Sequence, residues 1–295
     1  MGAERLNFLN DYLFLKYMGE EGDEEQLISF LSAVLKKTGK EKIRSVQILE
    51  NRLMSAEIIG DKSSVLDLRA IMDNGSKVNI EVQLRDAGNM DRRSLFYWSR
   101  EYISGISAGG DYAKIPNVIT INILGTNFIE IDEIHASFHI REDIYGDYRL
   151  TDALEMHFID MVNFRHLKQK DIVNNALHRW LAFFDKNTDD ETIKKIIEMD
   201  TAIKKAHDKI MYVAQDREAL HAYHMREMAI YDYNSGMNAS KERGREEGKK
   251  EGREESKKEI AVNLKQAGFS AKEIAGFIGK TVEDVNKILE EQGLS

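Results

Sequence analysis

In the first 185 residues, some segments have apolar residues at helical spacing and others have the apolar pattern of strands. Apolar residues recur at helical spacing in residues 23–37, "DEEQLISFLSAVLKK", which predicts an amphipathic helix. The run "NVITINIL" at 117–124 is apolar and β-branched, as in a buried strand. Further elements are expected as strands at 45–49, 136–140 and 155–161 and as a helix at 171–184. This mixture predicts an α/β core.

The segment 66–82, "LDLRAIMDNGSKVNIEV", has the alternation of a β-hairpin. Its centre, "DNG", is a turn sequence in which Gly75 can take a positive φ, and a three-residue loop there pairs Met72 with Ser76. The same register places Asp67 directly opposite Glu81 and sends the apolar residues to the other face. One face of the hairpin is therefore predicted to join the core, and the other to gather polar groups.

Two carboxylates opposite each other in a hairpin have Cβ atoms about 5 Å apart and repel unless a cation lies between them. Mg²⁺ suits this role, because it binds one or two carboxylates together with water and substrate phosphate. Arg69, expected opposite Asn79, offers another interpretation, in which the hairpin face is solvated and the arginine neutralises Asp67 and Glu81. The pattern alone leaves both interpretations open.

The net charge of −9 repels DNA phosphates, so a DNA-directed function needs a local basic patch. Residues 90–102, "MDRRSLFYWSREY", supply one if they form a helix. One stripe of that helix is typical of core packing and consists of Leu95, Trp98 and Tyr102. A second stripe is basic and aromatic and consists of Arg93, Tyr97 and Arg100, with Arg85 and Arg92 nearby in sequence. This second stripe either contacts phosphates or is a solvated face with acidic partners.

Composition excludes several classes of site. The chain has no cysteine, which excludes disulfides, thiolate zinc sites and cysteine nucleophiles and fits a reducing compartment. We find no basic and apolar leader and no apolar run near the roughly 18 residues that span a bilayer, so we expect a cytoplasmic protein without membrane contact. No glycine-rich phosphate-binding loop is present, so no nucleotide cofactor is expected.

Composition also divides the chain into four regions. Residues 1–185 form the α/β core, residues 186–239 a helical extension, residues 240–259 a stalk or linker rich in glycine and charge, and residues 260–295 a small tip resembling a helix-turn-helix. The stalk places glycine at every fourth position among charges of both signs. Such a segment is a frayed helix, a helix that a partner stabilises, or a solvated linker.

The tip carries helix start signals. Ser270 with Glu273 makes a capping box, and Thr281 can cap the final helix. That final helix is mostly acidic, which disfavours DNA reading and favours a protein contact. We therefore expect a homo-oligomer formed through the stalk and the tip.

Several motifs together carry a resemblance to a known family. In order along roughly residues 7–185 they are "NDYLFLKYMG", "VLDLRAIMDNGSKVNIEVQ", "MDRRSLFYWSREY", "YAKIPNVITINIL" and "LTDALEMHFIDM". They resemble the Rpn family of recombination-promoting nucleases and transposases, in the PD-(D/E)xK superfamily. The resemblance implies a restriction-endonuclease-like core, in which helices flank a mixed central sheet, with a C-terminal helical extension.

The resemblance also implies chemistry. Asp67 and Glu81 match the acidic positions that hold Mg²⁺, with Mn²⁺ as a substitute, and Gln83 stands where many relatives have lysine. Asp11 matches an acidic position of the N-terminal motif and either reaches the metal or caps a helix, a role that Asn10 also suits. The implied function is a Mg²⁺-dependent DNA endonuclease that promotes recombination or transfer of a mobile element. The alternative is a catalytically inactive DNA-binding or assembly protein on a nuclease fold.

Overall fold

The computed structural model describes residues 6–40, 42–49, 67–84, 88–107 and 109–294. The chain divides into two compact units, Met1–Asp232 and Tyr233–Ser295. Within the described residues, none of the helices combines the length and the apolar character that crossing a membrane requires.

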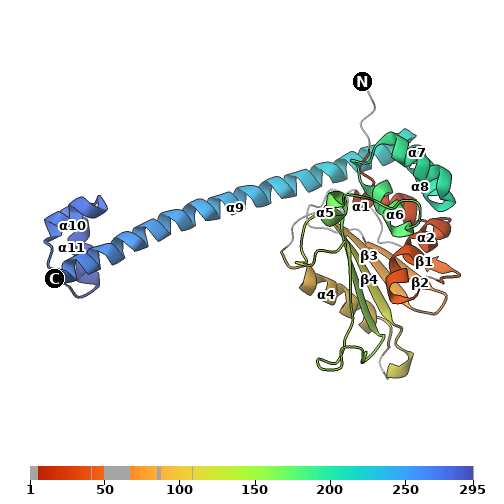
Figure 1. The fold of residues 1–295 in the computed structure, drawn as a ribbon, viewed down its shortest axis with the longest axis horizontal. Helices are drawn as coiled ribbons and strands as arrows, with labels where there is room; N and C mark the ends of the chain where they lie inside the picture. Colours follow the sequence, from red (N-terminus) through yellow and green to blue (C-terminus); the bar gives the residue numbers. More distant parts are fainter. Residues whose placement is uncertain (1–5, 41, 50–66, 85–87, 108, 295) are drawn as a thin grey trace. The chain divides into compact units, whose positions relative to one another are not determined.

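The first unit is built on a six-stranded mixed sheet with the order β1-β2-β3-β4-β6-β5 (Figure 1). The central strands β3, β4 and β6 are parallel, while β1, β2 and β5 are antiparallel to their neighbours. The strands are β1 (Val46–Ile48), β2 (Asp67–Met72), β3 (Lys77–Gln83), β4 (Val118–Leu124), β5 (His135–Phe138) and β6 (Leu154–Asp160). Each strand expected from the sequence is present, and the α/β class is confirmed.

The hairpin of β2 and β3 has the predicted register. Asp67 lies opposite Glu81, and Arg69 lies opposite Asn79. Gly75 has a φ of 81° at the turn, and the Met72 N–H donates to the Ser76 carbonyl at 2.9 Å. A positive φ without strain at this position requires glycine, so the turn fixes which side chains share a face.

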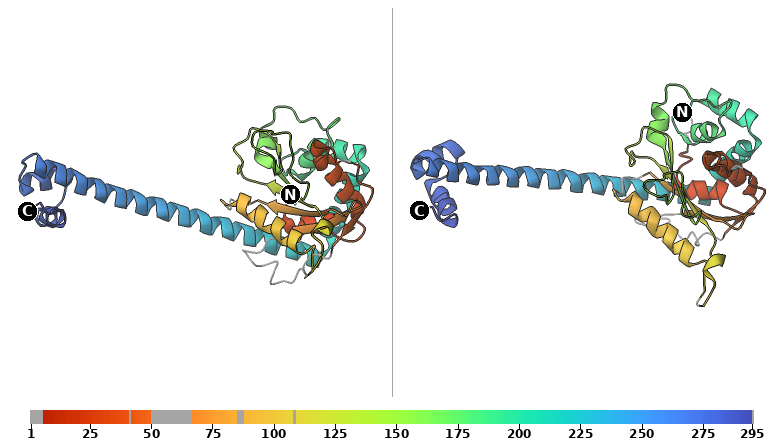
Figure 2. Two further views of the ribbon diagram at one scale, coloured as in Figure 1. Left: turned by 90° about the horizontal axis from the view of Figure 1, so that it is seen from below. Right: turned by 60° about the horizontal axis from the view of Figure 1, so that its bottom comes forward.

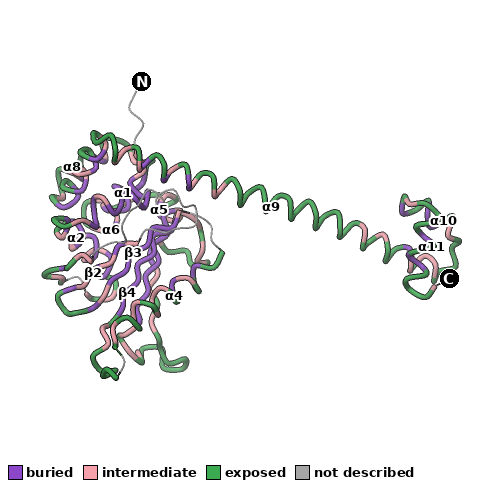
Figure 3. Tube along the Cα trace, turned by 180° about the vertical axis from the view of Figure 1, so that it is seen from behind, coloured by how far each residue is buried: buried purple, intermediate pink, exposed green. Residues whose placement is uncertain are grey.

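One face of the sheet is covered by most of the helices of this unit. Figures 1 and 2 show α1, α2 and α6 on that side and α4 on the other. The central strands β3 and β4 are buried along nearly their whole length, as Figure 3 shows. The helices are α1 (Asp11–Met18), α2 (Glu24–Leu35), α5 (Met161–His166), α6 (Ala176–Phe184), α7 (Asp190–Met199) and α8 (Thr201–Gln215), with short 3-10 turns at Lys36–Thr38 and Tyr112–Lys114.

The crossover helix α4 (Met90–Ile103) covers the opposite face and joins β3 to β4. Its buried residues Met90 and Ser94 face the sheet, and Trp98 packs partly against the same small core. Because these contacts follow an i, i+4 stripe, Leu95 falls on the flank and is 48% exposed. The prediction that Leu95 is a core residue is therefore wrong. The other two residues of the predicted stripe, Trp98 and Tyr102, stack on each other with 4.9 Å between their ring centroids.

Helix α9 (Arg217–Gln266) contributes its first turns to this unit. There Arg226, 1% exposed, holds the carboxylate of Asp11 with two hydrogen bonds, from Nε to Oδ1 at 2.8 Å and from a terminal nitrogen to Oδ2 at 2.5 Å. Asn10, not Asp11, caps α1, since its side chain accepts the Leu13 N–H at 3.1 Å. The buried ion pair thus joins α1 to a helix more than 200 residues further along the chain.

The second unit comprises the rest of α9, α10 (Ala271–Ile278) and α11 (Val282–Glu291). Residues 240–259 are helical throughout, and nearly all of them are exposed. The capping box of Ser270 and Glu273 is confirmed, and Thr281 caps α11 with Asp284. The small core consists of Ala261, Ile274, Ala275, Ile278, Val285, Ile288 and Leu289.

Removal of one partner of the Asp11–Arg226 pair tests how strongly α9 is attached. We expect Asp11→Ala to lower the free energy of unfolding by about 3–5 kcal/mol, because Arg226 is left charged and buried. Urea denaturation followed by circular dichroism measures the change. The double variant Asp11→Leu with Arg226→Met is the control, since apolar replacement of both partners should recover most of the loss. An Asp11→Ala protein as stable as wild type would show that the pair contributes nothing.

Candidate functional site

Asp67 and Glu81 meet on the face of the sheet that α4 covers. Asp67 opens β2 and is half-buried, and Glu81 lies within β3 with 1% of its surface exposed. They are direct partners in the antiparallel ladder, which brings their Cβ atoms to about 5 Å. The structure thus brings Asp67 and Glu81 together, as the sequence predicted.

Arg93 of α4 is the nearest described cation to Glu81, with Nε 3.0 Å from Oε1. The N–H is not aligned for a hydrogen bond, and neither Glu81 oxygen accepts one from any residue in the described ranges. Arg93 Nε likewise has no hydrogen-bond acceptor there. The contact is therefore an ion pair without the aligned hydrogen bonds that usually stabilise a buried carboxylate.

Burial dominates the titration of both carboxyl groups. It raises the pKa of Glu81 to about 7, with the charges of Asp67 and Asp11 adding to the rise and Arg93 opposing it. Burial also raises the pKa of Asp67, against the charges of Arg69 and Arg100. The site is therefore a pair of carboxyl groups that ionise reluctantly unless a further cation is present.

The donor set fits a hard divalent cation. Two carboxylates, completed by water and substrate oxygens, are the protein ligands that Mg²⁺ usually takes. Glu81 offers two buried oxygens whose hydrogen-bonding capacity is unused within the described chain. No group of three or more His, Asp or Glu side chains forms a metal-binding cluster in the parts of the chain that the structure describes. The pair of Asp67 and Glu81 is thus a two-carboxylate site, not a closed cage.

Gln83 and Asp11 lie beside this pair. Gln83 is two residues from Glu81 on the same strand face, is 4% exposed, and lines a cavity of about 10 Å³ together with Asp11 and Arg226. That volume holds about one water molecule. Asp11 also influences Glu81 electrostatically, but its carboxylate is already bound by Arg226. Arg226 was not predicted as a partner of Asp11, because pattern reasoning does not pair residues so far apart in the chain.

The basic stripe of α4 lies beside the two carboxylates, because Arg93 contacts Glu81. The Arg93 guanidinium lies 5.4 Å from the Tyr97 ring centroid and donates to the Tyr97 hydroxyl at 3.2 Å. Arg100 is exposed and lies 6.0 Å from the same ring. Arg92 is exposed, and Arg85 lies outside the described residues. Arg69 pairs with Glu101 at 3.2 Å, and its charge also acts to lower the pKa of Asp67.

A second polar cluster, on the opposite face of the sheet, was not foreseen. His157 Nε2 lies 2.9 Å from the Glu155 carboxylate, and its Nδ1 lies 2.8 Å from His135 Nε2. Thr38 donates to Glu155 at 2.6 Å, and Lys40 forms an ion pair with it. Residues 155 and 157 share one strand face, which is the signal that sequence reasoning passed over.

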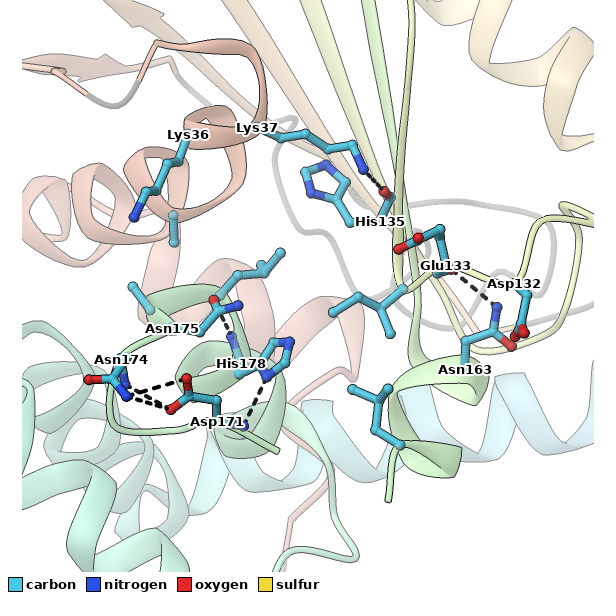
Figure 4. A pocket seen from close by; sticks show the side chains of 15 residues that line it. Lys36, Lys37, Asp132, Glu133, His135, Asn163, Asp171, Asn174, Asn175 and His178 are labelled. Atoms are coloured by element: carbon cyan, nitrogen blue, oxygen red, sulfur yellow. Dashed lines mark hydrogen bonds between the residues drawn. The ribbon is translucent and has the colours of Figure 1, made fainter. Parts of the chain in front are cut away.

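The cluster borders a cavity of about 710 Å³, shown in Figure 4. Lys37 donates to the His135 carbonyl there, and Asp171 donates its N–H to His178 Nδ1 at 3.0 Å. Burial lowers the pKa of His135 to about 3 and also lowers the pKa of His178, so both rings are neutral at pH 7. Asp67 and Glu81 do not line this cavity, so it is separate from the carboxylate pair.

Comparison with known proteins identifies the family of the chain. A family model described as PD-(D/E)XK nuclease family transposase matches residues 8–240, which include the hairpin, α4 and the Asp11–Arg226 pair. Searches of curated proteins and of solved structures found no significant match. The match covers well over half of the chain and agrees with the motifs and with the observed sheet. The chain therefore belongs to the PD-(D/E)XK nuclease family of transposases.

Proposed function

We propose that the protein is a metal-dependent DNA endonuclease that hydrolyses phosphodiester bonds and so promotes recombination or transfer of a mobile element. Asp67 and Glu81 would hold Mg²⁺, with Mn²⁺ as a substitute. The observation that carries the proposal is the buried Glu81 carboxylate, which lies opposite Asp67 with no hydrogen bond to either oxygen from the described chain. A buried charge left in this state is costly, so the site favours an added cation.

When bound, a divalent cation would polarise the scissile phosphate and lower the pKa of a water molecule. The protein's own side chains then have defined tasks. Gln83 can donate and accept hydrogen bonds but carries no charge, so it suits orienting a water rather than stabilising developing negative charge. No covalent intermediate on the protein is needed. Asp11, bound to Arg226, is better placed to position α1 beside the site than to hold the metal.

DNA would approach along α4. Arg93, Tyr97 and Arg100 bring basic and aromatic groups beside the two carboxylates. Arg92, exposed on the same helix, and Arg85 belong to the same proposal by their sequence positions. Phosphate contacts of this kind position a duplex without reading its sequence. A local basic stripe is needed because the protein as a whole carries a net charge of −9. The absence of cysteine suits a cytoplasmic setting.

We also propose that the stalk and the tip mediate self-association. The exposed rings of Phe269 and Phe277 pack edge to face at 5.8 Å on the surface of the tip, and Phe277 is 66% exposed. Along the stalk, a Cβ added at Gly244, Gly248 or Gly252 would meet no atom within 4 Å. An aromatic patch and a glycine-lined helix together offer an apolar contact and close backbone approach to a second copy.

Cleavage of supercoiled plasmid tests the enzymatic proposal. We expect the wild-type protein to nick or linearise plasmid with Mg²⁺ or Mn²⁺ and to be inactive with EDTA. Asp67→Ala and Glu81→Ala should each lower the rate by at least about 100-fold, because the metal loses one of its two protein ligands. Retained DNA binding in a gel-shift assay is the control for folding.

Two other outcomes would redirect the proposal. DNA binding without metal-dependent cleavage by the wild-type protein would favour the inactive DNA-binding or assembly protein. Equal cleavage by the wild type and both variants would show that the activity comes from a contaminant.

The raised pKa of Glu81 predicts a pH-dependent stability of the metal-free protein. Between the unfolded value of 4.5 and the folded value of about 7, the folded protein holds a proton that the unfolded chain has lost, so stability falls as pH rises. Glu81→Gln cannot ionise, so at pH 8 in EDTA we expect it to be more stable than wild type by up to about 3 kcal/mol. At pH 4 the two should be equal. Urea denaturation at both pH values measures this.

Addition of Mg²⁺ at pH 8 supplies the complementary result. It should stabilise the wild type, because a ligand that binds the folded state raises the unfolding free energy, and should leave Glu81→Gln nearly unchanged. A wild type that is as stable as Glu81→Gln in EDTA would contradict the account of Glu81.

Self-association is tested by sedimentation equilibrium of the full-length chain. We expect Phe277→Ser to weaken association at least about tenfold, because an exposed aromatic anchor is lost. Lys272→Ser, on the exposed surface of the same helix, is the matched control and should leave association unchanged. A wild-type chain that stays monomeric at every concentration would overturn the oligomer proposal.

A further inference from the structure

Arg93 occupies an unusual position for a residue expected to contact DNA. Its Nε lies 3.0 Å from Glu81 Oε1, inside the carboxylate pair rather than on the outer surface of α4. The Glu81 side chain is 1% exposed, so the guanidinium supplies positive charge where water cannot screen it. Arg93 therefore stands where a metal bound to Glu81 would place its own charge.

Arg93 is held at Glu81 by charge and not by good hydrogen-bond geometry. The N–H of Arg93 Nε finds no acceptor among the described residues, and the two Glu81 oxygens find no donor there. An arginine normally binds a carboxylate through two aligned hydrogen bonds, and a phosphate offers it the same geometry. The present contact does not use that capacity.

Arg93 is partly exposed and, besides Glu81 in the sheet, also contacts Tyr97 of α4. About 23% of its side chain is exposed. On the solvent side it meets Tyr97, by a hydrogen bond of 3.2 Å to the hydroxyl and by its position over the ring. Arg100 lies over the same ring, so a phosphate bound along this side of α4 would find two guanidinium groups next to one aromatic platform. Arg93 thus contacts both Glu81 and the basic and aromatic stripe of α4 along which DNA is proposed to bind.

We propose that Arg93 is a latch on Glu81 that DNA releases. Without DNA, its guanidinium competes with the divalent cation for the Glu81 carboxylate and keeps metal affinity low. A DNA phosphate draws Arg93 away, and Glu81 then takes the metal. The inference rests on the proposed metal-dependent nuclease function. It makes Arg93 a positioning residue that couples metal binding to the presence of substrate, which restricts the loaded site to the DNA-bound protein.

The latch has a thermodynamic consequence. If DNA raises the affinity for metal, then metal must raise the affinity for DNA by the same factor. A residue that only stabilised α4 would not create this coupling. A residue that only bound phosphate would change DNA affinity without changing the affinity of the free protein for metal.

Metal affinity of the DNA-free, full-length protein is the decisive readout. Mn²⁺ titrations by calorimetry, at about pH 8.5 so that protons compete little for the carboxylates, would compare wild type with Arg93→Gln, Arg93→Lys and Arg92→Gln. We expect Arg93→Gln to bind Mn²⁺ at least about tenfold more tightly than wild type. Arg93→Lys, which keeps the charge, should stay near wild type. Arg92→Gln, one residue away on the same exposed helix, should also be unchanged and controls for the loss of a positive charge on α4.

The second arm adds a short DNA duplex and uses Ca²⁺, with gel analysis to confirm that the duplex stays intact. Wild type should then gain metal affinity on adding DNA, and Arg93→Gln should gain little, because its latch is already absent.

The outcomes separate the latch from the proposed function. If Mn²⁺ binds wild type and not Glu81→Gln, but Arg93→Gln binds no more tightly than wild type, the latch is wrong and the metal site stands. If wild type and Glu81→Gln bind Mn²⁺ equally, or if neither Arg93→Gln nor the DNA-bound wild type binds a divalent cation, the metal site and the latch both fail. If Arg93→Gln tightens metal binding while Arg93→Lys and Arg92→Gln do not, the effect belongs to the charge at position 93 and the latch is supported.

Discussion

The burial of the Glu81 carboxylate is the constraint on which the rest of the site depends. The register of β2 and β3 places Asp67 opposite it, and α4 closes over both, so two like charges share a site with little water. Such a pair ionises only with help from positive charge. The raised pKa of Glu81, the inward position of Arg93 and the fit to a divalent cation are three consequences of this one arrangement.

The surrounding fold protects that arrangement. The parallel strands β3, β4 and β6 form a rigid, buried platform, and Gly75 fixes the hairpin register at its edge. Helix α1 is held beside the site by the Asp11–Arg226 pair, which brings the first helix and α9 to the same end of β3. Family membership over residues 8–240 is consistent with this, because the match runs from α1 through the first turns of α9 and beyond.

Local chemistry made the sheet, the hairpin register and the helix caps predictable from the sequence. The pairing of Asp67 with Glu81 followed from the period of two in a strand and from a short turn. Leu95 was misplaced because helical spacing alone does not say which stripe meets the sheet. The partners of Asp11 and Glu81 escaped prediction for another reason: Arg226 and Arg93 reach them through tertiary packing, for which a single sequence carries no periodic signal.

The central claim is that Asp67 and Glu81 together hold a divalent cation. Anomalous diffraction from crystals soaked in Mn²⁺ tests it most directly, because the position of the ion is observed without reference to activity. The account predicts one strong anomalous peak between the carboxylates of Asp67 and Glu81, with Arg93 turned away from Glu81 where the ion is present. A peak at the cluster of His135, His157 and Glu155, or no peak beside Glu81, would contradict it.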